Sequence, residues 1–196
     1  PKQQIDIYGG KKDIQEPRPL IELGERMYIE GPLQPGWDAI GRKNLVSPAF
    51  SLYGDWRTGF AYNRQNNEKQ IGQFATRLNL DADLGFTSTE RLHALFRPLD
   101  QGGQFTRYEA FGPDASHQFN ARPNLNPRTF FFEGDAGNLL AGFSDKYQNF
   151  DLPFAVGLVP LIMQNGVWFN SAISGGAFSI TGRNSPQLGI SNMDFT

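Results

Sequence analysis

Two stretches of this chain alternate between apolar and polar residues for longer than an ordinary β-strand. In residues 70–86 one face would carry Phe74, Thr76, Leu78, Leu80, Ala82, Leu84 and Phe86. The other face would carry Gln73, Ala75, Arg77, Asn79, Asp81, Asp83 and Gly85. Successive side chains of a strand point to opposite faces, so the pattern predicts one strand with an apolar and a charged face. Its length would be roughly 55 Å at about 3.3 Å per residue, whereas soluble strands average about 5–6 residues.

The rest of the chain also indicates antiparallel β structure. Residues 48–63 repeat the alternation less regularly, and the polar turn Thr87–Thr89 predicts a hairpin between 70–86 and a strand at 90–98. Further strands are predicted at residues 129–142, 152–162, 173–181 and 189–196, and a small strand at 104–111. The fold class predicted is therefore all-β and antiparallel, with about 7–8 strands in this chain.

Two parts of the chain interrupt this pattern. Residues 1–46 have no clear period and many prolines and glycines, so an irregular amino-terminal arm is expected, with one short helical turn at 19–27. Residues 47–196 would form the strand region, which includes a long loop at 100–127. Since the chain begins at Pro1 with no apolar leader after it, we expect a mature chain from which a signal peptide has been removed.

Composition narrows the functional classes. The net charge is −2, so no basic field predicts a nucleic-acid partner. Cysteine is absent, which excludes disulfides and thiol chemistry. No run of 18 apolar residues is present, so a transmembrane helix is not predicted. If the protein spans a membrane, it must do so as a closed β-barrel, because lipid offers no partner to unpaired backbone groups.

The distribution of charge favours a membrane barrel over a soluble sandwich. In residues 48–63 and 72–86 every charged residue lies on the polar face. A cation on the lipid face would cost roughly 2–4 kcal/mol at the bilayer midplane. Aromatic residues near the strand ends suit interfacial girdles, although Trp56 lies in mid-strand: Phe50, Phe60, Tyr62, Phe74 and Phe86. The odd number of main strands, seven, indicates that this chain is part of a larger barrel.

Three segments carry a resemblance to a known group of proteins. Residues 53–58 (YGDWRT), 77–84 (RLNLDADL) and 154–169 (FAVGLVPLIMQNGVWF) resemble the amino-terminal strands of Gram-negative outer-membrane porins, including the alginate-export-like group. The matching stretches cover about residues 48–99 and 128–196. The resemblance implies a β-barrel channel in the bacterial outer membrane, in contact with lipid. Porins typically end on an aromatic residue, whereas here Thr196 follows Phe195.

Motifs for catalysis or metal binding are weak. Glu90 and His93 have the spacing of a metal-binding motif found on helices. On a strand, however, two residues that are three positions apart point to opposite faces. Asp81 and Asp83 share a face, as the two catalytic carboxylates of a glycosidase would. The favoured interpretation is that both carboxylates face the lumen of a barrel and that Arg77 balances their charge. We therefore predict no enzyme activity, no metal and no cofactor.

The function expected is passive or substrate-selective passage of small polar solutes. The residues expected to line the pore are Asp55, Arg57, Arg77, Asn79, Asp81, Asp83, Arg91, His93, Arg97, Glu133 and Asp135. One alternative is a structural outer-membrane barrel that scaffolds a partner protein. Another is a soluble carbohydrate-binding β-sandwich with Trp37, Trp56 and Trp168 as stacking platforms. A homo-oligomer is a further possibility that the sequence leaves open.

Overall fold

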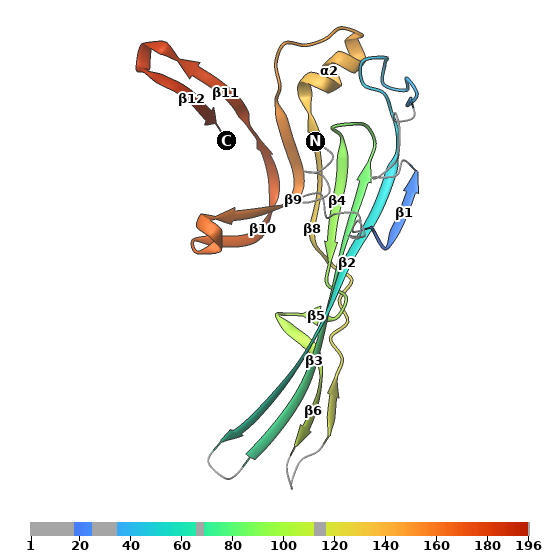
Figure 1. The fold of residues 1–196 in the computed structure, drawn as a ribbon, viewed down its shortest axis with the longest axis vertical. Helices are drawn as coiled ribbons and strands as arrows, with labels where there is room; N and C mark the ends of the chain where they lie inside the picture. Colours follow the sequence, from blue (N-terminus) through green and yellow to red (C-terminus); the bar gives the residue numbers. More distant parts are fainter. Residues whose placement is uncertain (1–17, 25–34, 66–68, 112–116, 196) are drawn as a thin grey trace, which may run out of the picture.

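The protein is built on one large antiparallel sheet. The structure, a computed structural model, describes residues 18–24, 35–65, 69–111 and 117–195. The sheet has the strand order β1-β2-β3-β4-β8-β9-β10, and β11 and β12 form a separate two-stranded sheet (Figure 1). The predicted all-β antiparallel fold is confirmed. Within the described residues the large sheet has free edges at β1 and β10, so it is not closed on itself.

The elements have the following bounds. The strands are β1 (Ile21–Gly24), β2 (Ala49–Gln65), β3 (Lys69–Gly85), β4 (Arg91–Phe96), β5 (Asp100–Gln101), β6 (Gln104–Phe111), β7 (Gln118–Asn120), β8 (Pro127–Asp135), β9 (Pro153–Met163), β10 (Phe169–Phe178), β11 (Ile180–Ser185) and β12 (Ile190–Phe195). The helical segments are α2 (Ala136–Ser144) and the 3-10 turns η1 (Gln164–Gly166) and η2 (Pro186–Leu188). None of the helices in the described ranges is both long enough and apolar enough to cross a membrane.

The long strands predicted in the middle of the chain are present. β2 and β3 each contain 17 residues and pair without interruption from Ala49↔Gly85 to Gln65↔Lys69. The turn at 87–89 joins β3 to β4, as predicted, and β4, β8, β9 and β10 follow as antiparallel neighbours. Strict alternation persists in this pairing because it contains no bulge to shift the register.

The loop predicted at 100–127 contains the small strand predicted at 104–111, which is β6, and the two short strands β5 and β7, which were not predicted. β3 pairs with β4 only over Leu80–Gly85, and β6 pairs with the other half of β3, over Ile71–Thr76. Residues 97–103, which we call the inward loop, leave the sheet between these two pairings. β6 forms because β4 stops at Phe96, and half of β3 would otherwise present unpaired backbone groups.

The strand predicted at 129–142 is wrong after Asp135, where α2 begins. The carboxylate of Asp135 accepts a hydrogen bond from the backbone N–H of Asn138 at 2.9 Å, which is an N-cap. The helix ends at Ser144, and the C-cap residue Asp145 adopts a left-handed conformation. The helix cap at Asp135 therefore favours a helix after this residue, although the alternation of the sequence continues to predict a strand.

Predictions near the two ends also need correction. The helical turn expected at 19–27 is absent over Ile21–Gly24, which instead forms β1 against β2; residues 25–27 lie outside the described ranges. The strand expected at 173–181 is split at Ser179 between β10 and β11. The last strand, expected at 189–196, is β12, which pairs with β11 and not with the large sheet.

The two faces of the large sheet differ in chemistry. One face, the apolar face, carries a continuous row across six neighbouring strands: Leu23, Phe50, Leu84, Leu92, Phe132 and Val156. Many large apolar side chains on this face are exposed, with Trp56 at 73% and Phe60 at 74%. Among the described residues the only buried hydrophobic residues are Ala94 and Ala141. As far as the described residues show, the sheet therefore has no conventional apolar core on either side.

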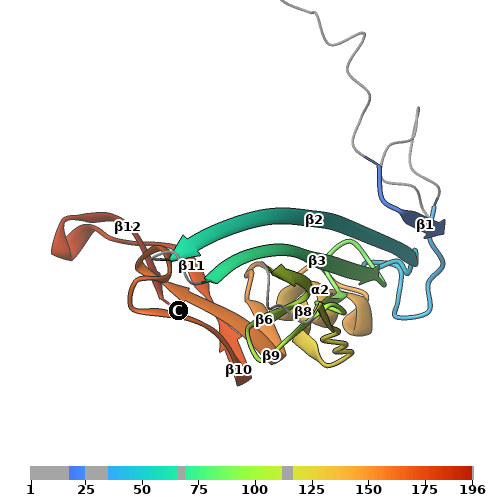
Figure 2. The same ribbon diagram turned by 90° about the horizontal axis from the view of Figure 1, so that it is seen from below.

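The sheet is strongly curled. Seen from below, β2 and β3 arch across from β9 and β10 (Figure 2). Curvature at β9 involves Gly157, which has φ of +136°, a value that side chains with a Cβ rarely adopt. A Cβ on Gly157 would lie 2.4 Å from the carbonyl oxygen of Phe130 on β8.

Gly157→Ala is therefore expected to destabilise the protein by about 1–3 kcal/mol, a range typical of one strained backbone position. Its cross-strand partner Gly175 is the matched control, because a Cβ there would meet no atom within 4 Å. The measurement is the free energy of unfolding of both alanine variants. Equal effects at Gly157 and Gly175 would contradict a conformational requirement at β9.

Candidate functional site

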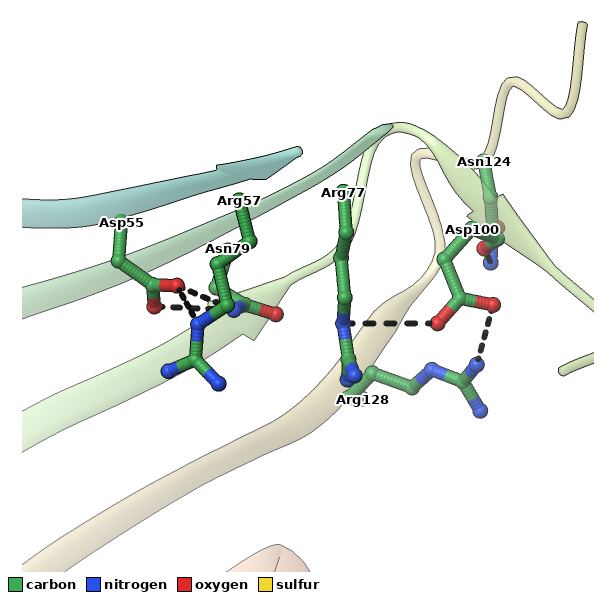
Figure 3. A network of polar contacts seen from close by, with 7 residues as sticks. All are labelled: Asp55, Arg57, Arg77, Asn79, Asp100, Asn124 and Arg128. Atoms are coloured by element: carbon green, nitrogen blue, oxygen red, sulfur yellow. Dashed lines mark hydrogen bonds and ion pairs between the residues drawn. The ribbon is translucent and has the colours of Figure 1, made fainter. Parts of the chain in front are cut away.

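The charged side chains predicted to share one face do so. The strand register aligns Asp55 with Asn79 and Arg57 with Arg77 across β2 and β3. It also aligns Asp83 with His93. Figure 3 shows Asp55, Arg57, Asn79 and Arg77 projecting to the same side, toward Arg128 of β8. We call this side of the sheet the charged face.

The first group on the charged face surrounds Asp55. The Nε of Arg57 lies 2.5 Å from Oδ2 of Asp55, and the amide of Asn79 donates to both carboxylate oxygens at 2.9 and 3.0 Å. All three side chains come from facing positions of β2 and β3 (Figure 3). The carboxylate and guanidinium of this group are thus already satisfied by each other.

The second group is built around Asp100 on the inward loop. This side chain is almost fully buried, since only 2% of the residue is exposed. Its Oδ2 lies 3.9 Å from Nε of Arg77, and its Oδ1 lies 3.4 Å from Nη2 of Arg128 (Figure 3). The amide of Asn124 donates to the backbone oxygen of Asp100 at 3.0 Å. The inward loop therefore lies against the charged face of β3.

The third group is centred on His93. Its Nδ1 lies 3.0 Å from Oδ2 of Asp83, and its Nε2 lies 2.9 Å from Oε1 of Glu133. The imidazole is stacked on the ring of Phe131, with 4.9 Å between centroids. Arg91 adds a cation, 3.7 Å from the same oxygen of Asp83. His93 thus bridges carboxylates of β3 and β8 across β4.

A hollow of about 490 Å³ opens on the charged face between the first two groups. Its lining is Tyr53, Gly54, Asp55, Arg57, Arg77, Asn79, Asp81, Leu95 and Arg97. Arg97 differs from the other arginines here, because no carboxylate of the described residues lies within ion-pairing distance of it. The volume is in the range of sites that bind small organic molecules.

Asp135 has a different setting from the other residues predicted to line the pore. It is buried at the end of β8, where its two oxygens accept hydrogen bonds from the N–H groups of Asn138 and Leu152, both at 2.9 Å. These contacts fix the start of α2 and the start of the segment leading to β9. The structure gives Asp135 the geometry of a helix cap, apart from the three groups described above.

Next to Asp135 a buried glutamate joins three segments. Glu90, which is 2% exposed, accepts hydrogen bonds from Asn44 and Thr89 at 2.8 Å, from the N–H of Asp135 at 3.3 Å, and from the hydroxyl of Thr87. Burial raises the pKa of Glu90, but these hydrogen bonds together lower the pKa below its usual value. The contacts tie the β3–β4 turn to residue 44 and to the start of α2.

Sequence reasoning found most of the charged face but missed Asp100, Arg128 and Glu90. A signal for Asp100 was available, because Asp100-Gln101-Gly102-Gly103 is a turn-like run that ends a strand and starts another. No group of three or more His, Asp or Glu side chains within the described ranges could hold a metal ion.

Comparison of the chain with models of known protein families, with curated proteins and with solved structures finds no match in any of the three.

Proposed function

We propose that this chain forms part of a β-barrel in the bacterial outer membrane, and that its charged face lines a channel for small polar solutes. The observation that carries the proposal is the separation of the two faces. Apolar side chains remain exposed over a face that spans several strands, while Arg, Asp, His and Glu side chains collect on the opposite, charged face. Contact with lipid would suit the apolar face, and contact with water would suit the charged face.

The alternative of a soluble sandwich is less well supported. A sandwich buries its apolar face against a second sheet about 10 Å away. In the described residues the apolar face has no such cover, since Trp56, Phe60 and Val156 are all more than half exposed. A soluble monomer seldom leaves an apolar area of this extent in water.

The proposal includes further strands that pair with the free edges at β1 and β10. Hydrocarbon supplies no hydrogen-bond partner for an unpaired strand edge, so a spanning sheet must be closed. The orientation that we propose places the end with α2, Glu90 and the β3–β4 turn in the periplasm. The opposite end, beyond Gln65 and Phe111, would face outward.

The test is reconstitution of the native protein, isolated from its membranes, into lipid vesicles. Extraction should require detergent, and the vesicles should become permeable to a small sugar such as arabinose. Vesicles that received heat-denatured protein are the control. A protein that is recovered in aqueous buffer as a monomer, and that leaves vesicles impermeable, would reject the channel proposal.

A further inference from the structure

The region around the inward loop contains more guanidinium groups than carboxylates. Arg77, Arg97 and Arg128 surround one buried carboxylate, that of Asp100. Each oxygen of Asp100 already has a partner, since Arg77 lies nearest Oδ2 and Arg128 nearest Oδ1. Within the described part of the chain, Arg97 is left without an anionic partner. The cluster therefore has an excess of positive charge that this part of the protein does not balance.

The same arginines have buried donors that make no hydrogen bond within the described residues. The Nε atoms of Arg77, Arg97 and Arg128 are shielded from solvent and have no hydrogen-bond acceptor among the described residues. A buried donor without an acceptor costs about 1–3 kcal/mol, and more when the group is charged. Such groups are rare in folded proteins, and each calls for an explanation such as a bound water or ion.

The hollow places two of these arginines around a space of suitable size. Arg77 and Arg97 both line it, and so does Arg57, whose guanidinium is already engaged by Asp55. Asp81 also lines the hollow and contributes one negative charge. Asp55 is the second carboxylate of the lining, but Arg57 and Asn79 occupy its oxygens.

The inward loop holds this arrangement in one conformation. Backbone hydrogen bonds run from Asp100 N to Arg97 O at 3.1 Å, from Thr106 N to Leu99 O at 2.9 Å and from Asn124 N to Pro98 O at 3.0 Å. A site whose groups are fixed before binding loses less conformational entropy when its ligand arrives.

We propose that the hollow binds the oxyanion group of a solute, a carboxylate or a phosphate, between Arg97 and Arg77. The planar guanidinium presents N–H donors in a fork that matches two oxygens of such a group. This inference rests on the proposed function in one respect, because the bound anion would be the solute that passes through the channel. A channel lined in this way would favour anions over cations of the same size.

The experiment is calorimetric titration of the purified protein in detergent at low and constant ionic strength. Sodium phosphate and sodium acetate are titrated separately into the wild type, Arg97→Gln and Arg107→Gln. Arg107 is the matched control, because it lies on the same face but is paired with Glu109 at 2.6 Å. We expect saturable binding to the wild type, weakened about tenfold or more by Arg97→Gln and less than about twofold by Arg107→Gln.

A third variant, Arg97→Lys, keeps the positive charge but lacks the forked N–H donors of the guanidinium. Its affinity is expected to lie between that of the wild type and that of Arg97→Gln. All variants must give the β-rich circular dichroism spectrum of the wild type. Tighter binding of phosphate than of acetate would assign the solute to phosphate esters, and the reverse order to carboxylates. Equal binding by the wild type and Arg97→Gln, or no saturation with either anion, would overturn the proposal.

Binding in this assay requires neither a membrane nor a closed barrel. If the protein binds an anion saturably but leaves vesicles impermeable, the proposed anion site is supported and the proposed channel is rejected. Permeable vesicles together with no binding would keep the channel and reject the anion site.

Discussion

Replacing Val156 with arginine is expected to lower the free energy of unfolding in a lipid bilayer by more than about 1 kcal/mol, and by at most the roughly 2–4 kcal/mol of the bilayer midplane. Val156 is the fourth residue of β9 on the apolar face, in a row with Phe132 and Leu92, and is 55% exposed. In water, an arginine at so exposed a position would change stability by no more than about 0.5 kcal/mol. The large cost arises only if lipid covers this face.

The matched control is Ala155→Arg, one residue away on the charged face. Ala155 pairs with Glu133, so a new guanidinium there would lie beside a carboxylate and in water. Both variants would be unfolded by urea from lipid vesicles, with tryptophan fluorescence as the signal. If Val156→Arg and Ala155→Arg have the same small effect, the apolar face is not in contact with lipid.

Glu90→Gln is expected to destabilise the protein by about 3 kcal/mol, which is the second large effect. The glutamine cannot accept all the hydrogen bonds that the carboxylate receives from Asn44, Thr87 and Thr89. Buried donors that lose their acceptor cost about 1–3 kcal/mol, and more when a charge is involved. Asp151→Asn removes the same charge from an exposed site and should have little effect.

The contribution of Glu90 also has a predictable dependence on pH. The folded-state pKa of Glu90 is lower than its usual value, so the folded protein holds the ionised carboxylate more strongly than the unfolded chain does. The stabilisation is therefore complete above the unfolded-state pKa and is lost as the pH falls through the folded-state pKa. The stability difference between the wild type and Glu90→Gln should shrink under acid conditions. A difference that stays constant down to strongly acidic pH would contradict this assignment.

The sequence predicted the central strands well because one physical pattern dominates them. In β2 and β3 each side chain must lie on a defined face, and a register shift of one residue would move charges to the apolar face. Arg77, Asn79 and Asp81 could therefore be assigned to one face from spacing alone, and the register confirms this.

The errors lie where contacts of individual side chains, and not the alternation of a strand, decide the structure. The alternation that continues past Asp135 was overridden by a cap that the side chain of Asp135 forms with Asn138. Asp100 was missed because its position depends on Arg77 and Arg128, which are distant in the sequence. The alternation of apolar and polar residues predicts on which face of a strand a side chain lies. It does not predict where the strand ends or which residues a connecting loop contacts.

The divided pairing of β3 has a consequence for how such a protein can diversify. β4 and β6 each pair directly with β3. The seven residues between Phe96 and Gln104 therefore do not determine the register of either strand. Residues can be inserted into or removed from the inward loop while β4 and β6 keep their alignment with β3. Under the proposed function, the preference for a solute would change by variation in this loop and at Arg97, without the many compensating substitutions that a shifted sheet would demand.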